Sequence, residues 1–235
     1  MNNHQVIVTG ASRGIGAAIA VDLDRRGFKV AALSRSGDTI VGKGYVCDMT
    51  DEAAVAHSIA EIARAGPVIG LVNNAGAYVG TPSANLTLAD LEATFRLNSS
   101  AVFVACREAY PHLKGAGDSL IVNIGSFFDK LAVPEGLAYS ASKAAVGAMT
   151  RCLAAEWAKD GIRVLDVAPG YIETDLNRES LAKEKVGKWL AKRIPVGRPG
   201  AADEVGRLVG ALFAEKIGFL TGSTIYIDGC QGTNL

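Results

Sequence analysis

Tyr139 and Lys143 stand four residues apart in a segment that predicts the opening turn of a helix running to about Asp160. A helix brings residues four apart onto one face, so we expect the phenol and the ammonium group to point into the same space. A free phenol has a pKa of ~10, and lowering it to roughly 7 takes about 4 kcal/mol. One cation at ~4 Å supplies about that much at an effective dielectric of ~20. The pair therefore predicts an acid/base device, although this spacing also arises by chance.

A glycine-rich turn follows a predicted strand, Gln5 to Thr9, and precedes a predicted helix that ends near Arg26. Glycines allow the backbone to approach a pyrophosphate, and a helix N-terminus favours its negative charge. Strand, turn and helix form the context that a dinucleotide site requires. The candidate residues of this turn are Gly10, Ser12, Arg13, Gly14, Ile15 and Gly16.

The second predicted strand, Lys29 to Leu33, ends without the acidic residue that would bind the ribose 2′-hydroxyl of NAD. Arg35 follows that strand, and with Arg13 it could instead face a 2′-phosphate, because a guanidinium group matches phosphate geometry. The alternative is a pair of solvated surface arginines. We predict NADP(H) as the cofactor.

Composition excludes several classes of function. Hydrophobic residues make up 49% of the 235, and 24 basic residues balance 24 acidic ones, without a basic run that would indicate nucleic acid. Apolar runs are far shorter than the ~18–20 residues of a membrane span, and we expect no signal peptide and a cytoplasmic location. The histidines are isolated, so no metal site is predicted, and we expect reduced, mostly buried thiols at Cys47, Cys106, Cys152 and Cys230.

Strands and helices alternate along the whole chain, which predicts right-handed crossovers and a parallel sheet. We expect an α/β fold: one domain over residues 1–235, with a Rossmann-type doubly wound sheet of about seven strands and helices on both faces.

A polar trio that starts at Asn98 interrupts a helix predicted from Thr87 to about Lys114. Pro169 and Gly170 are expected to break a late strand, and the polar segment 171–195 predicts a small substrate lid.

Several motifs, in this order, resemble those of the short-chain dehydrogenase/reductase family over essentially the full length. They are the turn from Thr9 to Gly16, Asp48, the run Asn73-Asn74-Ala75-Gly76, Asn98, Ser126 thirteen residues before Tyr139, the Tyr139–Lys143 pair, and Pro169-Gly170 with Thr174. The resemblance implies catalytic roles for Asn98, Ser126, Tyr139 and Lys143. It implies a cofactor site formed by Gly10, Ser12, Arg13, Gly14, Ile15, Gly16, Arg35, Asp48, Asn74, Ala75, Gly76, Tyr139, Lys143, Pro169, Gly170, Ile172 and Thr174.

Within that resemblance, Tyr139 exchanges a proton with the substrate oxygen, Ser126 hydrogen-bonds that oxygen, and Lys143 lowers the pKa of Tyr139 and binds the nicotinamide ribose. Asn98 holds a water that links Lys143 to solvent. From the residues alone, a buried Asn in a helix is equally a structural hydrogen-bonding group.

A narrower resemblance points to 3-oxoacyl-[acyl-carrier-protein] reductases, which implies a carbonyl or alcohol substrate and includes acyl thioesters. Phe127 and Phe128 depart from that pattern. They either narrow a substrate site that also contains Ser126 and Tyr139, or they are ordinary packing. No basic patch for an acidic carrier protein is evident.

The helix that contains Tyr139 is apolar on more than one side, which predicts a homotetramer. The reaction that we expect is the NADPH-dependent reduction of a ketone to a secondary alcohol. One alternative is an NAD(P)-dependent secondary-alcohol dehydrogenase, because the same residues serve both directions. The other is a regulatory protein that binds NADP(H) without turnover, which the intact Ser126, Tyr139 and Lys143 disfavour.

Overall fold

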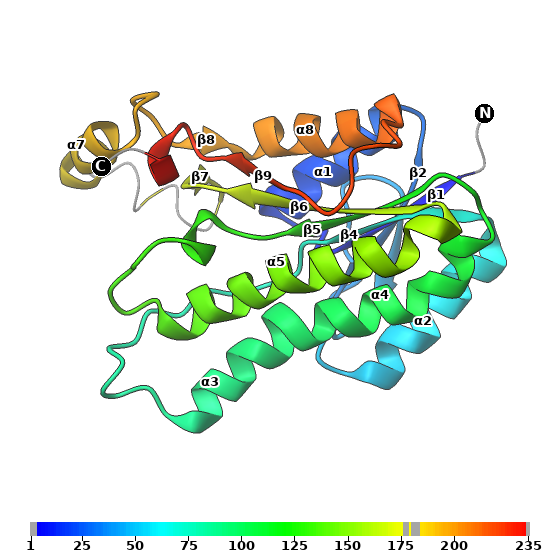
Figure 1. The fold of residues 1–235 in the computed structure, drawn as a ribbon, viewed down its shortest axis with the longest axis horizontal. Coiled ribbons are helices and arrows are strands. Elements are labelled where there is room, and N and C mark those ends of the chain that lie inside the picture. The colour runs from blue at the N-terminus through cyan, green and yellow to red at the C-terminus, as the bar shows by residue number, and fades with distance from the viewer. Residues whose placement is uncertain (1–3, 176–178, 180–183, 234–235) are drawn as a thin grey trace.

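A parallel seven-stranded sheet forms the centre of the structure, in the order β3-β2-β1-β4-β5-β6-β9 (Figure 1). The computed structural model describes residues 4–175, 179 and 184–233. The predicted α/β class and the strand count of the sheet are confirmed. Its strands are Gln5–Thr9 (β1), Lys29–Ser34 (β2), Lys43–Val46 (β3), Val68–Asn73 (β4), Ser119–Ile124 (β5), Ile162–Pro169 (β6) and Thr224–Ile227 (β9).

Helices cover both faces of this sheet. Figure 1 shows α1 and α8 on one face, and α2, α4 and α5 on the other. The α-helices are Gly14–Arg25 (α1), Glu52–Ala65 (α2), Leu88–Phe95 (α3), Ala101–Lys114 (α4), Leu137–Trp157 (α5), Glu184–Arg193 (α7) and Ala202–Glu215 (α8). The predicted interruption of the long helix at Asn98 is a π-helix, Arg96–Ser100, between α3 and α4.

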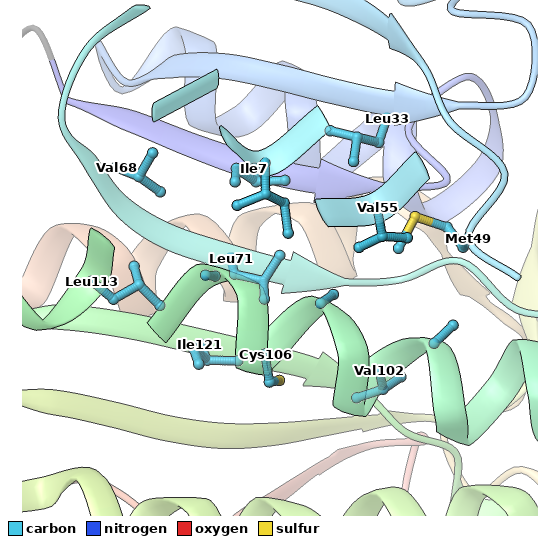
Figure 2. Close-up of a cluster of buried hydrophobic side chains, with 14 of the residues drawn as sticks. Ile7, Leu33, Met49, Val55, Val68, Leu71, Val102, Cys106, Leu113 and Ile121 are labelled. Carbon is cyan, nitrogen blue, oxygen red and sulfur yellow. The ribbon is translucent and has the colours of Figure 1, made fainter. Parts of the chain in front are cut away.

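The core lies in two layers because the central strands have apolar side chains on both faces. Every residue of β1, β4, β5 and β6 is buried, as expected of a parallel sheet with helices on both sides. Figure 2 shows the layer beneath α2 and α4, where Ile7, Leu71 and Ile121 from three strands meet Val55 and Cys106 from the helices. The other layer packs beneath α1 and α8.

Two details of the strands differ from the sequence prediction. β6 continues through Pro169, which pairs with Ile227 of β9, and the next residue, Gly170, donates its N–H to the Ile227 carbonyl at 3.0 Å. Proline is tolerated there because it is the last residue of the strand. A second small sheet, β7 (Ile172–Glu173) with β8 (Gly200–Ala201), was not predicted.

The order of the strands creates a topological switch point between β1 and β4, because the chain builds outward from β1 in one direction and from β4 in the other. Ligands of open α/β sheets bind beyond the carboxyl ends of the strands at such a point. The glycine-rich turn follows β1 and the turn from Asn74 follows β4. The fold therefore brings both predicted motifs to the same edge.

The predicted lid segment, 171–195, contains β7 and α7, and α7 is anchored by the buried side chain of Leu190 with Ile194 just beyond it. Residues 176–178 and 180–183 of that segment lie outside the described residues. Within the described chain, no helix combines the length and apolarity that membrane crossing requires. The expectation of buried thiols holds for Cys47 and Cys106 and is wrong for Cys152 and Cys230, which are exposed.

Candidate active site

The glycine-rich turn between β1 and α1 adopts a backbone that only glycine enters easily. Gly10 and Gly14 have φ values of 65° and 57°, in the left-handed region that other residues avoid. Gly16 has a different constraint, since a Cβ there would collide with the Gly10 carbonyl oxygen and the Asn74 side-chain amide. The turn is thus tight and free of side chains at these three positions, which is the surface that a pyrophosphate needs.

Asn74 holds this turn in place. Its Nδ2 donates to the carbonyl oxygens of Thr9 and Gly10 at 3.0 and 3.1 Å. The Thr9 hydroxyl in turn accepts the backbone N–H groups of Asn74 and Ala75, both at 3.0 Å. The side chain of Asn74 therefore links the two turns at the switch point.

The segment after β6 closes the same region from the other side. A Cβ on Gly14 would lie 3.5 Å from the Thr174 Cγ2 atom, so Thr174 lies against the glycine-rich turn. Ile172 is buried and packs in the core with partly buried Ile15. The turn, Asn74 and Thr174 form a cradle that fits a dinucleotide, with backbone groups rather than bulky side chains on its inner surface.

Two exposed arginines and one carboxylate mark the end of this edge near β2 and β3. Asp48 accepts the backbone N–H and the hydroxyl of Thr50 at 2.9 and 2.8 Å. These hydrogen bonds, and more weakly the charge of Arg35, lower the pKa of Asp48. Arg13 and Arg35 are exposed, and among the residues that the structure describes neither guanidinium forms an ion pair.

The structure places the side chains of Ser126 and Tyr139 beside each other. Ser126 follows β5 and caps a 3-10 helix, Phe127–Asp129, accepting the Phe128 N–H at 3.2 Å. Tyr139 lies in the first turn of α5. Burial raises the pKa of the Tyr139 phenol, and its hydrogen bond with Ser126 opposes that shift. Tyr139 is therefore protonated at neutral pH.

Lys143 lies one helical turn after Tyr139, as predicted, but it does not act on the phenol as expected. Its Nζ donates to the Ile124 carbonyl at 2.7 Å and lies 5.7 Å from the centroid of the Tyr139 ring. Burial lowers the pKa of Lys143 to about 8, against the opposing charge of Asp166. The prediction that Lys143 lowers the pKa of Tyr139 is not supported, because desolvation is the largest cause of the shift and Lys143 is not among its causes.

Asn98 is fully buried in the π-helix, and its side chain braces the site. Its Oδ1 accepts the Ala77 N–H at 3.0 Å, and its Nδ2 donates to the Ala77 carbonyl at 2.9 Å and to the Ser142 hydroxyl at 3.2 Å. Gly76 lies close by, because a Cβ there would be 3.6 Å from the Lys143 Nζ. The Asn98 side chain therefore ties the turn at Ala77 to α5 at Ser142.

Buried Asp166, on β6 behind this site, was missed by the sequence analysis. Its Oδ2 accepts the Thr224 hydroxyl at 3.0 Å, while Oδ1 has no hydrogen-bond partner among the described residues. Its carboxylate packs against Gly125, where a Cβ would collide with it. Burial raises the pKa of Asp166 to about 6. A carboxylate within the apolar run 162–169 was the signal available in the sequence.

Aromatic residues surround Tyr139, and only part of this group was predicted. Phe127 and Phe128 are buried beside it. Tyr78 and Tyr171 complete the group and were missed, although each follows a predicted cofactor motif closely. Within the described ranges, no group of three or more His, Cys, Asp and Glu side chains could hold a metal ion.

Comparison with known proteins gives a consistent result. The family model described as Enoyl-(Acyl carrier protein) reductase matches residues 10–231. Gluconate 5-dehydrogenase from Gluconobacter oxydans (strain 621H) is 34% identical over 245 residues, covering 97% of this chain and 94% of the relative. Acetoacetyl-CoA reductase from Shinella zoogloeoides is 35% identical over 235 residues, covering 96% and 97%.

Solved structures agree with the sequence relatives. A gluconate 5-dehydrogenase from Burkholderia cenocepacia J2315, in complex with NADP and tartrate, matches with a TM-score of 0.90 at 31% identity. The match covers 100% of this chain and 97% of the other.

Proposed function

Because this chain belongs to the short-chain dehydrogenase/reductase family of oxidoreductases, we propose that it reduces a ketone to a secondary alcohol with NADPH. The observation that carries the proposal is that Ser126 and Tyr139 lie beside each other, with Lys143 one turn away and the glycine cradle at the same sheet edge. Such a reaction needs a group that donates the proton, a group that hydrogen-bonds the reacting oxygen, and a site for the nucleotide. Tyr139, Ser126 and the glycine cradle are the candidates for these three roles.

The residues of the cradle are suited to hold the cofactor. The turn from Gly10 to Gly16 would receive the pyrophosphate, and Asp48 and Arg35 lie where the adenosine end would bind. The absence of an acidic residue directly after β2 favours NADP over NAD, because a carboxylate there would repel a 2′-phosphate. When bound, the nicotinamide supplies the hydride that reduces the carbonyl carbon.

The residues of the chain supply the proton and the electrostatic environment. The Tyr139 hydroxyl gives its proton to the carbonyl oxygen, and the Ser126 hydroxyl donates a hydrogen bond to that same oxygen as its charge develops. Because its pKa is raised, Tyr139 carries the proton to be donated before the carbonyl binds. Lys143, whose Nζ is held by the Ile124 carbonyl, is suited to bind the nicotinamide ribose, and Asn98 keeps the turn at Ala77 fixed against α5.

The test is the loss of NADPH absorbance across a carbonyl panel: acetoacetyl thioesters, diketones, quinones, aromatic ketones and keto-sugars. Tyr139→Phe should lower kcat at least ~10²-fold, as expected for removal of a general acid, while NADPH binding is retained. The matched control, Tyr110→Phe, removes a hydroxyl that bonds Asp160 far from the site and should leave turnover intact. Near-normal turnover in Tyr139→Phe would contradict the proposed role of Tyr139 as proton donor.

A second candidate is the oxidative direction, favoured by the name of the gluconate 5-dehydrogenase relative. Measuring kcat/KM with NADPH plus ketone and with NADP⁺ plus the matching alcohol at neutral pH separates the two. An enzyme that oxidises alcohols several-fold faster would reverse the assignment. Cofactor binding without turnover in either direction would favour a regulatory role.

We also propose that residues 1–235 act as one NADP(H)-binding domain and that the protein is a homotetramer. The cytoplasmic location stays a prediction. The acetoacetyl-CoA reductase relative is the reason to include acyl thioesters among the first substrates tested.

A further inference from the structure

Six aromatic rings form a continuous row from α7 to the candidate proton donor. Tyr171 contacts Trp189 of α7, with ring centroids 6.0 Å apart, and contacts Phe127 and Phe128 at 5.5 and 6.2 Å. Phe128 contacts Tyr139 at 5.9 Å. Five separate segments of the chain contribute these rings, so the row is a feature of the tertiary fold rather than of one motif.

The rings nearest to the reacting hydroxyls enclose the Tyr139 side chain on two sides. Tyr78 meets Tyr139 edge to face, at 5.2 Å and 89°, and Phe128 meets it at 90°. Tyr78 and Phe128 also contact each other at 6.0 Å. A carbonyl that accepts hydrogen bonds from Ser126 and Tyr139 therefore sits within reach of these rings.

The two ends of the row are exposed although they are large aromatic side chains. Tyr78 is 50% exposed and Trp189 is 45% exposed, while Phe127 and Phe128 between them are buried. Exposed aromatic groups that continue into a buried aromatic base form a surface for a ligand with apolar faces. The row thus offers both a rigid base and accessible rings.

The hydrogen-bonding groups of the row itself are the hydroxyls of Tyr78, Tyr139 and Tyr171, while its other three rings are apolar or, in Trp189, donate only. Among the described residues, the Arg193 guanidinium lies 5.2 Å from the centroid of Trp189, and Glu135 lies near the turn that holds Tyr78. Two further charged side chains close to the row already have partners: Lys143 donates to the Ile124 carbonyl, and Asp129 accepts the Tyr226 hydroxyl. Each hydroxyl of an open-chain sugar that loses water without gaining a partner weakens binding. A flat ring with few polar groups incurs no such cost.

We infer that the site takes a planar, mostly apolar ring ketone in preference to an open-chain polyhydroxy ketone. This rests on the proposed function, because it names the substrate class of that same site. It also separates this chain from relatives whose names refer to sugar acids.

The experiment compares kcat/KM for isatin, a planar ring ketone, with kcat/KM for erythrulose, an open-chain polyhydroxy ketone, both with NADPH. We expect the wild-type ratio to favour isatin at least tenfold. Phe128→Leu and Trp189→Leu remove a ring but keep an apolar side chain, and each should lower the ratio about three- to tenfold, the value of one aromatic contact. The control Phe219→Leu alters a fully exposed ring outside the row and should leave the ratio unchanged.

Trp189 is half exposed, so its variant keeps the test valid if Phe128→Leu fails to fold. A wild-type ratio of kcat/KM that favours erythrulose, or a ratio that neither variant changes, would overturn the substrate class. Turnover of any ketone would still support the proposed reductase. If no ketone of the wider panel is reduced, the reductase and this inference fail together. The two failures are therefore distinguishable.

Discussion

At the scale of single residues, Arg35 decides the proposed choice of cofactor. It is exposed directly after β2, where an acidic residue would bind the ribose 2′-hydroxyl of NAD. Arg35→Asp removes a phosphate partner and adds a repelling charge, so the ratio of kcat/KM for NADPH to that for NADH should fall ~10²-fold or more.

The control for this change is Arg64→Asp, an exposed arginine in the last turn of α2, close to the start of β1 and so at the opposite edge of the sheet. It introduces the same charge change away from the cradle and should keep the wild-type ratio. An unchanged NADPH preference in Arg35→Asp would remove Arg35 from the cofactor argument.

Asp166 gives a prediction about stability and pH. Burial raises its pKa to about 6 from an ordinary value of 3.8, so the folded state binds the proton more tightly than the unfolded state. Stability then falls as pH rises from about 4 to 6 and stays lower above that range. The asparagine in Asp166→Asn cannot ionise. The free energy of unfolding of this variant, relative to wild type, should therefore increase over the same pH range toward about 3 kcal/mol, at ~1.36 kcal/mol per pKa unit.

Thermal melts of Asp166→Asn and wild type at pH 4, 6 and 8 test this. The nearby Lys143 ammonium reduces the stability gained by Asp166→Asn, because it favours the ionised carboxylate of Asp166. The charge of Asp129 increases that gain, because it disfavours the ionised carboxylate. The exposed Asp24→Asn on α1 should show no such trend. A melting-temperature difference that shrinks with rising pH would contradict the account.

Sequence patterns located some residues of the site and not others, for a physical reason. Ser126, Tyr139, Lys143 and Asn98 are recognisable because each has a fixed spacing within a local motif. The aromatic row and buried Asp166 depend on which segments meet in the fold. The pKa of Tyr139 was misjudged because the sequence indicates a neighbouring cation but not the burial of the phenol.

At the scale of elements, the turn between β1 and α1 depends on the closeness of two backbones. A Cβ on Gly16 would collide with the Gly10 carbonyl and Asn74 Nδ2, although the φ of Gly16 lies outside the left-handed region. Gly16→Ala should therefore cost about 1–3 kcal/mol of stability by overpacking and displace the turn. We expect NADPH affinity to fall at least tenfold, measured by fluorescence titration.

The matched control is Gly218→Ala, where an added Cβ meets no atom within 4 Å. It should leave the NADPH affinity and the melting temperature near wild type. Wild-type affinity in Gly16→Ala would show that the turn tolerates displacement, and would weaken the assignment of this cradle to the cofactor.

The bounds of an element could be predicted from the sequence where a hydrophobic pattern ends at a turn or capping residue. β1 has the predicted bounds, Gln5–Thr9. The small sheet of β7 and β8 was missed because two-residue strands have no period. Its pairing joins segments more than 25 residues apart, which no local pattern encodes.

At the scale of the whole molecule, the residues that the structure describes leave a second face of α5 exposed. Ala144, Ala148 and Cys152 recur along this helix and are exposed, whereas Val146 and Thr150 face the core. Neighbouring α4 also exposes Phe103. Small residues along an exposed helix face permit close approach of another helix, and this supports the proposed homotetramer.

Ala148→Glu tests that interface, because it places a charge and a larger side chain in the middle of the exposed face of α5. Wild type should have four times the mass of one chain by light scattering at micromolar concentration, and the variant should yield smaller species. Ala53→Glu, a substitution at an exposed position of α2, controls for the added charge and should keep the wild-type mass.

A monomeric wild type would refute the tetramer. A tetramer unchanged by Ala148→Glu would move the interface away from α5, since a buried, unpaired carboxylate at close-packed helices should not be tolerated.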